Sequence, residues 1–268
     1  MSRPTALDGQ VLLATVAIEP NRWGTIRPDR SPSTRAAAWL DELAALDVDG
    51  LELWDGHLPP DGDPDLAALR DGPTPVRILS SYVAFDGEDD AGRRAAAEAR
   101  RRCGARAVKF NVGDDPSAAD DYARRVGRWI DHLDGAPAIC ECHRGTIAED
   151  PAVAARVLGA AGPPERVQAL VHTHDGPEHL AAAFDALGER ITHVHVNHLD
   201  PATLAHPTLA EVEDELGRTV GLLRAQGFAG SWTLEFVAGL LTPDDHPAAL
   251  LAQAASDLVV LHRALGAA

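Results

Sequence analysis

The chain has 268 residues, of which 45% are hydrophobic, and a formal net charge of −17 at pH 7. Nucleic acids are bound by Lys and Arg side chains that face phosphates, so 24 basic against 41 acidic residues argue against a nucleic-acid partner. Charged residues interrupt every apolar run before it approaches the roughly 20 residues of a membrane span, and the segment "MSRPTALDGQ" lacks the apolar core of a signal peptide. We therefore expect a cytoplasmic protein with no membrane association.

Short apolar runs alternate with amphipathic or alanine-rich segments along the chain. The runs that we predict as strands are 11–18, 50–54, 76–85, 106–112, 136–143, 166–174, 191–198 and 231–237. The segments that we predict as helices are 33–46, 64–70, 88–102, 117–133, 151–161, 177–187, 208–227 and a last one within 246–265. Ser31 or Ser33 would cap the first of these helices, with Pro32 in its first turn.

This alternation predicts the fold. When each strand is followed by a helix, neighbouring strands pair in parallel. Eight such units in about 250 residues fit one closed (β/α)8 TIM barrel over residues 1–268. A doubly wound open sheet is the alternative. Against it, the turn after the first strand reads "IEPNRWGT" and lacks the G-x-G-x-x-G that holds a pyrophosphate.

Polar side chains recur where the predicted strands end. In barrels of this type the active site lies at the carboxyl ends of the strands, so we expect these residues to surround it. In chain order they are Glu19, Glu52 and His57, Lys109 and Asn111, Glu141 and His143, His172, His174 and Asp175, His193, His195, Asn197 and His198, and Glu235.

The fifth strand shows how these side chains divide. Side chains alternate between the two faces of a strand, so Glu141 and His143 share one face and Cys140 and Cys142 share the other. We expect the cysteines to pack against helices, because they point away from Glu141. With Cys103, the three cysteines are too few for a disulfide scaffold.

The same alternation places Glu141, His172, His195 and Glu235 on the inner faces of four consecutive strands. Two carboxylates and two imidazoles form a mixed oxygen and nitrogen set that suits Mn²⁺, Zn²⁺, Co²⁺ or Fe²⁺. The alternative is that these side chains only hydrogen-bond to one another. A carboxylate inside "SWTLEFV" costs several kcal/mol of desolvation unless it is paired or binds a metal.

This layout resembles the xylose isomerase-like (β/α)8 family of sugar isomerases and epimerases. The family also includes inosose and 3-dehydroshikimate dehydratases, hydroxypyruvate isomerases and endonuclease IV. Four segments carry the resemblance over nearly the whole chain. "DGLELWDGH" is similar to the second-strand motif, "ICECHRGT" to the fifth-strand E-N-H-x-G-T, "ITHVHVNH" to the seventh-strand H-V-H-x-K-D, and "SWTLEF" to the end of the eighth strand.

The resemblance implies that Glu141 and Glu235 are metal ligands that also hold and deprotonate the sugar carbon, with His195 as the imidazole ligand. Two departures stand out. The family reads Asp-x-x-His on the sixth strand, where this chain has His172 and Asp175, so His172 or His174 would replace a carboxylate ligand. The Lys-Asp of the seventh strand is replaced by Asn and His, and the Arg of ketose 3-epimerases is missing.

Residues around these ligands would serve the substrate. His143 is either a general base, a role that histidine can play near neutral pH, or a partner that orients Glu141. The side chains expected to contact the substrate are Glu52, His57, Trp23, Lys109, His174 and Asp175. For Trp23 the alternative is packing within its own loop.

The resemblance implies a divalent-metal enzyme, with Mn²⁺ as the expected metal, that transfers a proton on a sugar, keto-sugar or polyol and so isomerises or epimerises it through an enediolate. The alternative is elimination. Catalytic subunits of C-glycoside deglycosidases share these features, release an aglycone from a 3-keto-glycoside and work with a small β-rich partner subunit; dehydratases are similar. Family members often form homo-oligomers. An endonuclease IV-like phosphodiesterase fits the net charge poorly, and a barrel that only binds a ligand is a further alternative.

Overall fold

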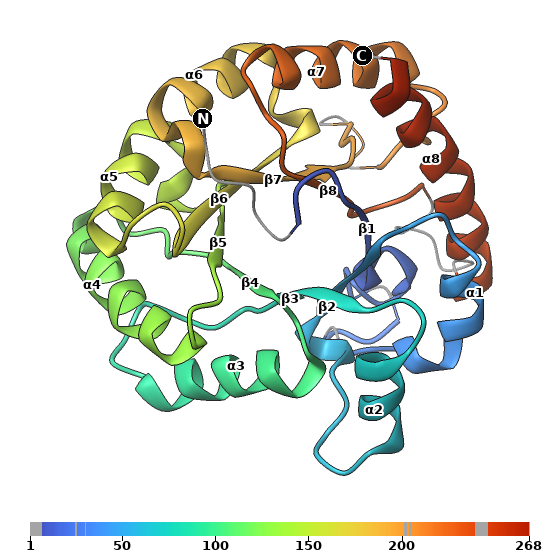
Figure 1. The fold of residues 1–268 in the computed structure, drawn as a ribbon, viewed down its shortest axis with the longest axis horizontal. Helices are drawn as coiled ribbons and strands as arrows, with labels where there is room; N and C mark the ends of the chain where they lie inside the picture. Colours follow the sequence, from blue (N-terminus) through green and yellow to red (C-terminus); the bar gives the residue numbers. More distant parts are fainter. Residues whose placement is uncertain are drawn as a thin grey trace.

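The eight strands form a closed barrel in which each strand pairs in parallel with the next and β1 pairs with β8 (Figure 1). The computed structural model describes residues 7–24, 26–29, 31–200, 203, 205–238 and 246–267. The strands are β1 (Val11–Ala14), β2 (Gly50–Trp54), β3 (Val76–Ser80), β4 (Ala107–Phe110), β5 (Ala138–Glu141), β6 (Val167–His172), β7 (Ile191–Val196) and β8 (Ser231–Leu234). The closed barrel confirms the predicted fold and excludes the open sheet.

Helices form the outer layer of the barrel (Figure 1). They are α1 (Leu40–Ala44), α2 (Pro64–Asp71), α3 (Asp90–Cys103), α4 (Ala119–Ile130), α5 (Pro151–Ala161), α6 (Pro177–Leu187), α7 (Glu213–Ala225) and α8 (Pro247–Ala267). Local sequence fixes where some of them begin. Asp150, for example, accepts hydrogen bonds from the backbone N–H groups of Ala152 and Val153, with Pro151 in the first turn of α5.

All the predicted strands except 50–54 are longer than the observed ones, and two of them extend furthest beyond the carboxyl end of the strand. The run 11–18 leaves the sheet after Ala14 and continues as a 3₁₀ helix over Thr15–Ile18. The run 76–85 forms a strand only over Val76–Ser80. In both cases the apolar sequence continues into a buried connection, so burial alone does not show where the ladder of hydrogen bonds ends.

The first predicted helix also begins later than expected. Residues 36–39 form a 3₁₀ turn and α1 follows it. Ser33 caps neither, because its backbone N–H and its hydroxyl both donate to the carboxylate of Glu19, at 2.9 and 2.5 Å. The prediction of a cap at Ser31 or Ser33 was therefore wrong, since a carboxylate 14 residues away binds the residue instead.

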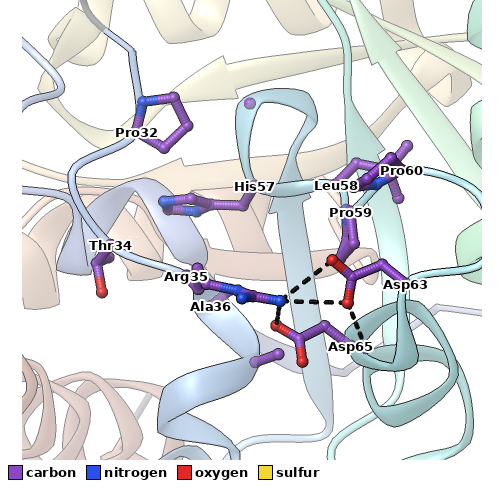
Figure 2. Close-up of a pocket in the computed structure, with 12 residues that line it drawn as sticks. Pro32, Thr34, Arg35, Ala36, His57, Leu58, Pro59, Pro60, Asp63 and Asp65 are labelled. Atoms are coloured by element: carbon purple, nitrogen blue, oxygen red, sulfur yellow. Dashed lines mark hydrogen bonds and ion pairs between the residues drawn. The ribbon is translucent and has the colours of Figure 1, made fainter.

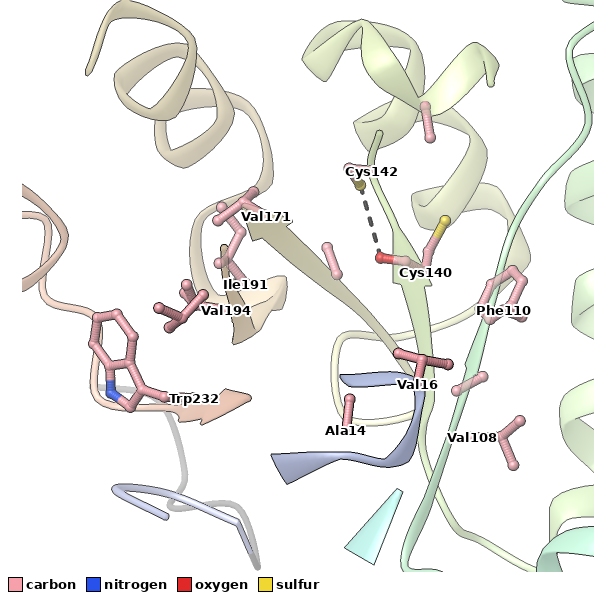
Figure 3. Packing of buried hydrophobic residues seen from close by; sticks show 14 of the residues in the cluster. Ala14, Val16, Val108, Phe110, Cys140, Cys142, Val171, Ile191, Val194 and Trp232 are labelled. Atoms are coloured by element: carbon pink, nitrogen blue, oxygen red, sulfur yellow. Dashed lines mark hydrogen bonds between the residues drawn. The ribbon is translucent and has the colours of Figure 1, made fainter. Parts of the chain in front are cut away.

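Buried apolar side chains lie on both sides of the strands. A small cluster fills the barrel below its carboxyl end and consists of Leu7, Leu12, Ile78, Ala107, Ile139 and Leu170. A larger cluster lies between the strands and the helices and contains Cys140 and Cys142 (Figure 3). Because Ile139 points inward and Cys140 outward, the next inward residue of β5 is Glu141, as the alternation predicted.

Helix α8 bears on the expectation of no membrane association. Pro247–Gly266 is long and apolar enough to cross a membrane, with a mean hydropathy of 1.3. We had expected no apolar run of that length. In the structure, Leu250, Leu258 and Leu261 are buried in the larger cluster. Asp257 is buried as well and accepts hydrogen bonds from Leu209 N and Gln253 Nε2, each at 2.9 Å. These contacts are those of a helix in the outer layer of a barrel.

Candidate metal centre

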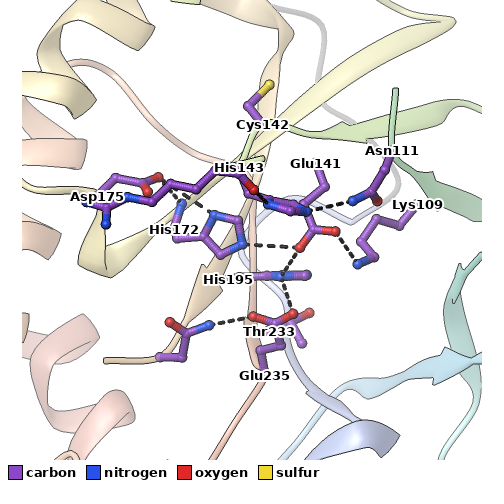
Figure 4. Close-up of polar contacts among 12 residues, drawn as sticks. Lys109, Asn111, Glu141, Cys142, His143, His172, Asp175, His195, Thr233 and Glu235 are labelled. Atoms are coloured by element: carbon purple, nitrogen blue, oxygen red, sulfur yellow. Dashed lines mark hydrogen bonds and ion pairs between the residues drawn. The ribbon is translucent and has the colours of Figure 1, made fainter. Parts of the chain in front are cut away.

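Four side chains converge at the carboxyl end of the barrel (Figure 4). Glu141, His172, His195 and Glu235 each place one potential ligand atom within 4.8 Å of all the others, and all four residues are buried. They end β5 and β6, lie in β7 and follow β8, so they come from four neighbouring strands. The register pairs His172 with His195 directly across β6 and β7. The structure thus brings together the four residues that the alternation placed on one face.

His195 lies at the middle of the group. Its Nδ1 is 3.1 Å from Glu235 Oε1 and 3.7 Å from Glu141 Oε1. Its Nε2 is 3.0 Å from Glu52 Oε2 and donates to it. Within the part of the chain that the structure describes, Nδ1 is buried and has no hydrogen-bond partner. A histidine that donates one ring N–H to a carboxylate and presents the other nitrogen to an oxygen-rich space has the geometry of a metal ligand.

His172 completes the group from β6. Its Nε2 is 3.2 Å from Glu141 Oε1, and its Nδ1 is 3.7 Å from Asp175 Oδ2. Asp175 also accepts a hydrogen bond of 2.8 Å from the backbone N–H of His172. Asp175, which we expected to contact the substrate, is therefore occupied in holding His172. Of the two histidines considered as the sixth-strand ligand, His172 belongs to the four-residue group and His174 does not.

Lys109 lies against Glu141. Its Nζ donates to Glu141 Oε2 at 2.6 Å, and both residues are buried. Burial disfavours the charge on Lys109, but the attraction of Glu141 outweighs it and raises the Lys109 pKa. Burial likewise opposes ionisation of Glu141, but Lys109 and His172 hold its pKa well below the usual range. Lys109 was expected to contact the substrate. In the structure its direct partner is Glu141, a candidate metal ligand.

Both imidazoles of the group are doubly protonated and positively charged at neutral pH in the metal-free chain. Burial opposes the charge on His172, but hydrogen bonds to Asp175 and Glu141 raise its pKa to about 9. Burial also opposes the charge on His195, and the carboxylates of Glu235 and Glu52 raise its pKa to about 10. A metal ion must displace these protons before it can bind the two nitrogens.

Two further imidazoles lie at the rim of the barrel, each held by an asparagine. Asn111 donates from Nδ2 to His143 Nε2 at 2.8 Å, and His143 Nδ1 donates to the carbonyl of Arg144. His174 Nδ1 donates to Asn197 Oδ1, whose amide nitrogen donates to Glu235 Oε2. Asn111 and Asn197 were expected to surround the site but had no specific role predicted, and each directly follows its strand, β4 and β7.

These contacts decide between the two roles considered for His143. Glu141 is held by Lys109 and His172, and His143 contacts neither of its oxygens. The His143 ring lies 6.2 Å from the His172 ring, centroid to centroid. His143 therefore does not orient Glu141 in this structure, and the role of general base remains as a proposal.

Two of the residues expected to line the substrate site are enclosed. Glu52 lies beneath His195, with its Oε2 also 3.4 Å from His193 Nε2. The His57 side chain is 0% exposed, and its ring nitrogens bond to Thr15 Oγ1 and Glu19 Oε2, both at 2.9 Å. This corrects the expectation, since the 3₁₀ turns after β1 and β2 direct these groups toward each other.

A separate pocket adjoins His57 and is lined by segments 32–37 and 56–65 (Figure 2). Arg35 extends along it and pairs with Asp63 at 3.2 Å and Asp65 at 2.6 Å. Since these charges are already paired and both His57 nitrogens are bonded, the pocket offers little for chemistry. We therefore place the site at the four-residue group.

No model of a protein family matches the chain, and no curated protein matches its sequence. Solved structures do match. The protein called IolI, solved with a zinc atom, superposes with a TM-score of 0.67 at 14% identity, over 95% of this chain and 98% of that chain. Endonuclease IV from Thermus thermophilus gives a TM-score of 0.64 at 14% identity, over 97% and 100% of the two chains.

A xylose isomerase-like TIM barrel/4-hydroxyphenylpyruvate dioxygenase fusion protein matches with a TM-score of 0.66 at 15% identity. This chain is covered over 94% of its length and spans 42% of the fusion protein. The fold is that of the xylose isomerase-like TIM barrels. The resemblance read from the four sequence segments is thereby confirmed for the fold.

Metal affinity should depend steeply on pH. The two imidazoles, with pKa values of about 9 and 10, keep their protons at pH 7, so a metal ion has to release them. We expect affinity for Mn²⁺ or Zn²⁺ to rise between pH 6 and pH 9 and to level off above pH 10. Calorimetric titration in buffers of different ionisation enthalpy measures both the affinity and the protons released. Equal affinity at pH 6 and pH 9 would contradict this.

Lys109→Met should destabilise the metal-free protein by about 3–5 kcal/mol, because it leaves Glu141 as a buried carboxylate without its cation. The free energy of unfolding from urea titration at pH 7.5 measures the loss. Adding Glu141→Gln to Lys109→Met removes the unpaired charge, so the double variant should be more stable than Lys109→Met alone. Additive losses in the two single variants would show that the pair is not coupled.

Proposed function

We propose that this chain is a divalent-metal-dependent enzyme that transfers a proton on a sugar, a keto-sugar or a polyol. The observation that carries the proposal is the convergence of two carboxylates and two imidazoles at the carboxyl end of the barrel. The Nδ1 of His195 forms no hydrogen bond among the described residues, and it faces Glu235 Oε1 at 3.1 Å and Glu141 Oε1 at 3.7 Å, as a metal-ligating nitrogen would.

The metal would be held by Glu141, His172, His195 and Glu235. The donor set suits Mn²⁺, our first choice, and is also compatible with Zn²⁺, Co²⁺ and Fe²⁺. When bound, a divalent ion polarises a substrate hydroxyl or carbonyl and makes the neighbouring C–H more acidic. Glu52 keeps His195 turned toward the ion, and Lys109 fixes the carboxylate of Glu141.

The protein's own groups would move the proton. Glu141 is a poor base, since Oε2 is bound to Lys109 and Oε1 faces His172. Glu235 meets only the neutral amide of Asn197 at Oε2, but its Oε1 lies 3.1 Å from His195 Nδ1. Burial opposes ionisation of Glu235, yet the charge of His195 lowers the pKa of Glu235 and so its strength as a base. His143 supplies an imidazole at the rim, whose Nε2 is released when the Asn111 contact opens. Return of the proton to the other face or to the neighbouring carbon of an enediolate gives epimerisation or isomerisation.

Elimination is the second candidate, and the pair of imidazoles at the rim favours it. Loss of a leaving group requires a base at the C–H and an acid at the departing atom. His143 and His174 lie outside the four-residue group and flank it, with the His174 ring 5.0 Å from that of His172. A lyase that releases an aglycone from a 3-keto-glycoside, or a dehydratase, would use both. A small β-rich partner subunit belongs to this version of the proposal, and a homo-oligomer is compatible with either.

A phosphodiesterase acting on DNA is disfavoured by charge. Although endonuclease IV shares the fold, this chain has a net charge of −17 and one lysine, which is bound to Glu141. We therefore propose a small carbohydrate substrate, no nucleic-acid partner and the cytoplasmic location expected from the sequence.

Metal content tests the centre directly. Elemental analysis of the purified protein should find about one divalent ion per chain, and Glu141→Ala and Glu235→Ala should each lose most of it, because each removes one of four ligands. Glu178→Ala, in the exposed first turn of α6, is the matched control and should keep its metal. If both ligand variants retained full metal content, the assignment would be wrong.

Turnover separates the two reactions. The protein would be incubated with ketoses, inososes and 3-keto-glycosides in D₂O and followed by NMR. Deuterium at the carbon beside the carbonyl indicates isomerisation or epimerisation, whereas a free aglycone or loss of water indicates elimination. His143→Ala should keep its metal and lose about 10²–10⁴-fold in kcat if the imidazole is the base. A variant with unchanged kcat would remove His143 from the mechanism.

A further inference from the structure

One arginine at the mouth of the barrel is surrounded by aromatic rings and has no acidic partner among the described residues. The guanidinium carbon of Arg22 lies 5.1 Å from the ring centroid of Trp23, 5.4 Å from that of Tyr82 and 5.8 Å from that of Trp54. Its Nη2 donates to the Tyr82 hydroxyl at 2.5 Å. Within the part of the chain that the structure covers, Arg22 forms no ion pair, and its buried Nε has no hydrogen-bond partner.

The lack of an ion pair among the described residues distinguishes Arg22 from the arginines that bind carboxylates. Other arginines, such as Arg93 and Arg125, pair with carboxylates. Asp55 is near enough to feel the charge of Arg22, but its Oδ2 accepts a hydrogen bond from the backbone N–H of Tyr82. Arg22 is half-buried among these rings, of which Trp23 and Tyr82 are themselves 37% and 46% exposed. A guanidinium in such a setting binds oxyanions strongly, because its donors match two oxygens at once.

Arg22 is close to the candidate metal centre. The centroid of the Tyr82 ring lies 5.4 Å from Arg22 Cζ and 5.5 Å from Lys109 Nζ, and Lys109 contacts Glu141. On the opposite side, the Trp23 ring lies 5.4 Å from the ring of Phe236, the residue after Glu235. The aromatic rim, defined as Trp23, Trp54, Tyr82 and Phe236, thus connects Arg22 to both carboxylates of the centre.

The loop that carries Arg22 is held by two buried side chains. Glu19 accepts hydrogen bonds from Asn21 N at 2.7 Å and from Ser33 N at 2.9 Å, in addition to the His57 contact. Asn21 donates to the carbonyl of Ser31 at 2.7 Å and accepts from Arg27 N at 2.7 Å. Arg22 is therefore positioned before any ligand arrives, which lowers the cost of binding.

From this geometry we propose that Arg22 binds an anionic oxygen group of the substrate, a carboxylate or a phosphate, while the reacting carbons lie over the four-residue group. The inference deepens the proposed function and rests on it for the neighbouring chemistry. It narrows the substrate from any polyol to a sugar acid or a sugar phosphate. Arg22 then determines specificity, and the aromatic rim surrounds the ion pair.

Calorimetric titration with three probes tests the proposal on the full chain: inorganic phosphate, glucuronate and, as the neutral counterpart, glucose. We expect saturable binding of phosphate or glucuronate and at least tenfold weaker binding of glucose. Arg22→Met should weaken binding of the anion by about 10- to 100-fold. Arg22→Lys keeps the charge but cannot form a bidentate contact, so its anion affinity should lie between those of the wild type and Arg22→Met. Whichever anion binds through Arg22 identifies the source as sugar acid or sugar phosphate.

Arg27→Met is the matched control, because it removes one positive charge from an exposed position of the same loop. It should leave anion affinity unchanged. Equal anion affinity in the wild type and Arg22→Met, with metal content intact in both, would overturn the role of Arg22 and leave the proposed function standing. Anion binding through Arg22 in a protein that purifies without metal would overturn the proposed function and leave the role of Arg22 standing.

Discussion

The hydrogen bond between His195 and Glu52 is the contact on which the rest of the centre depends. It joins two side chains that are buried inside the barrel and 143 residues apart. By engaging Nε2 it leaves Nδ1 as the nitrogen that faces Glu141 and Glu235. Burial opposes ionisation of Glu52, yet His195 and His193 hold its pKa well below the usual range, so the contact keeps a charged acceptor. Without it, the imidazole ring would lack a fixed orientation.

The other buried charges are arranged around this contact in a way that electrostatics dictates. An isolated carboxylate inside a barrel costs several kcal/mol, so each needs a partner. Glu141 has Lys109, Glu52 has His195 and Glu19 has His57. Within the described residues, Glu235 has an amide hydrogen bond and the shared Nδ1 of His195. Glu235 therefore shares its imidazole partner with Glu52, and its carboxylate lies beside the ring nitrogen that faces the centre.

The sequence was sufficient to predict the barrel and the convergence of four side chains because both follow from local periodicity. Alternation along a strand decides which residues face inward, and a closed barrel places consecutive strands side by side. Contacts between distant loops are different. Nothing local to His57 indicates that Glu19 will bind it, and nothing local to Lys109 distinguishes Glu141 from a substrate. The limits of β1 and β3 were missed because the backbone leaves the sheet while its side chains stay buried.

Arg22 was missed for a related reason. As one residue of a polar turn, it has no periodic pattern, and its surroundings come from the end of β2 and from the segment after β3 as well as from its own loop. The sequence singled out Trp23 as a substrate contact because of its large ring, whereas the charged group of this loop belongs to the preceding residue, Arg22. Partly buried aromatic rings that surround an arginine without an acidic partner form a pattern that only the assembled fold shows.

The hydrogen bonds of Glu19 and Asn21 have a consequence for how such a barrel diversifies. They come from residues 21–57 of the chain, whereas the four-residue group lies between 141 and 235. The hydrogen bonds that position the Arg22 loop therefore involve none of the four residues that would hold the metal. Substitutions that reshape the first loop can accumulate without disturbing the residues beneath it. One scaffold can in this way keep its chemistry while its preference for substrates changes from one descendant to the next.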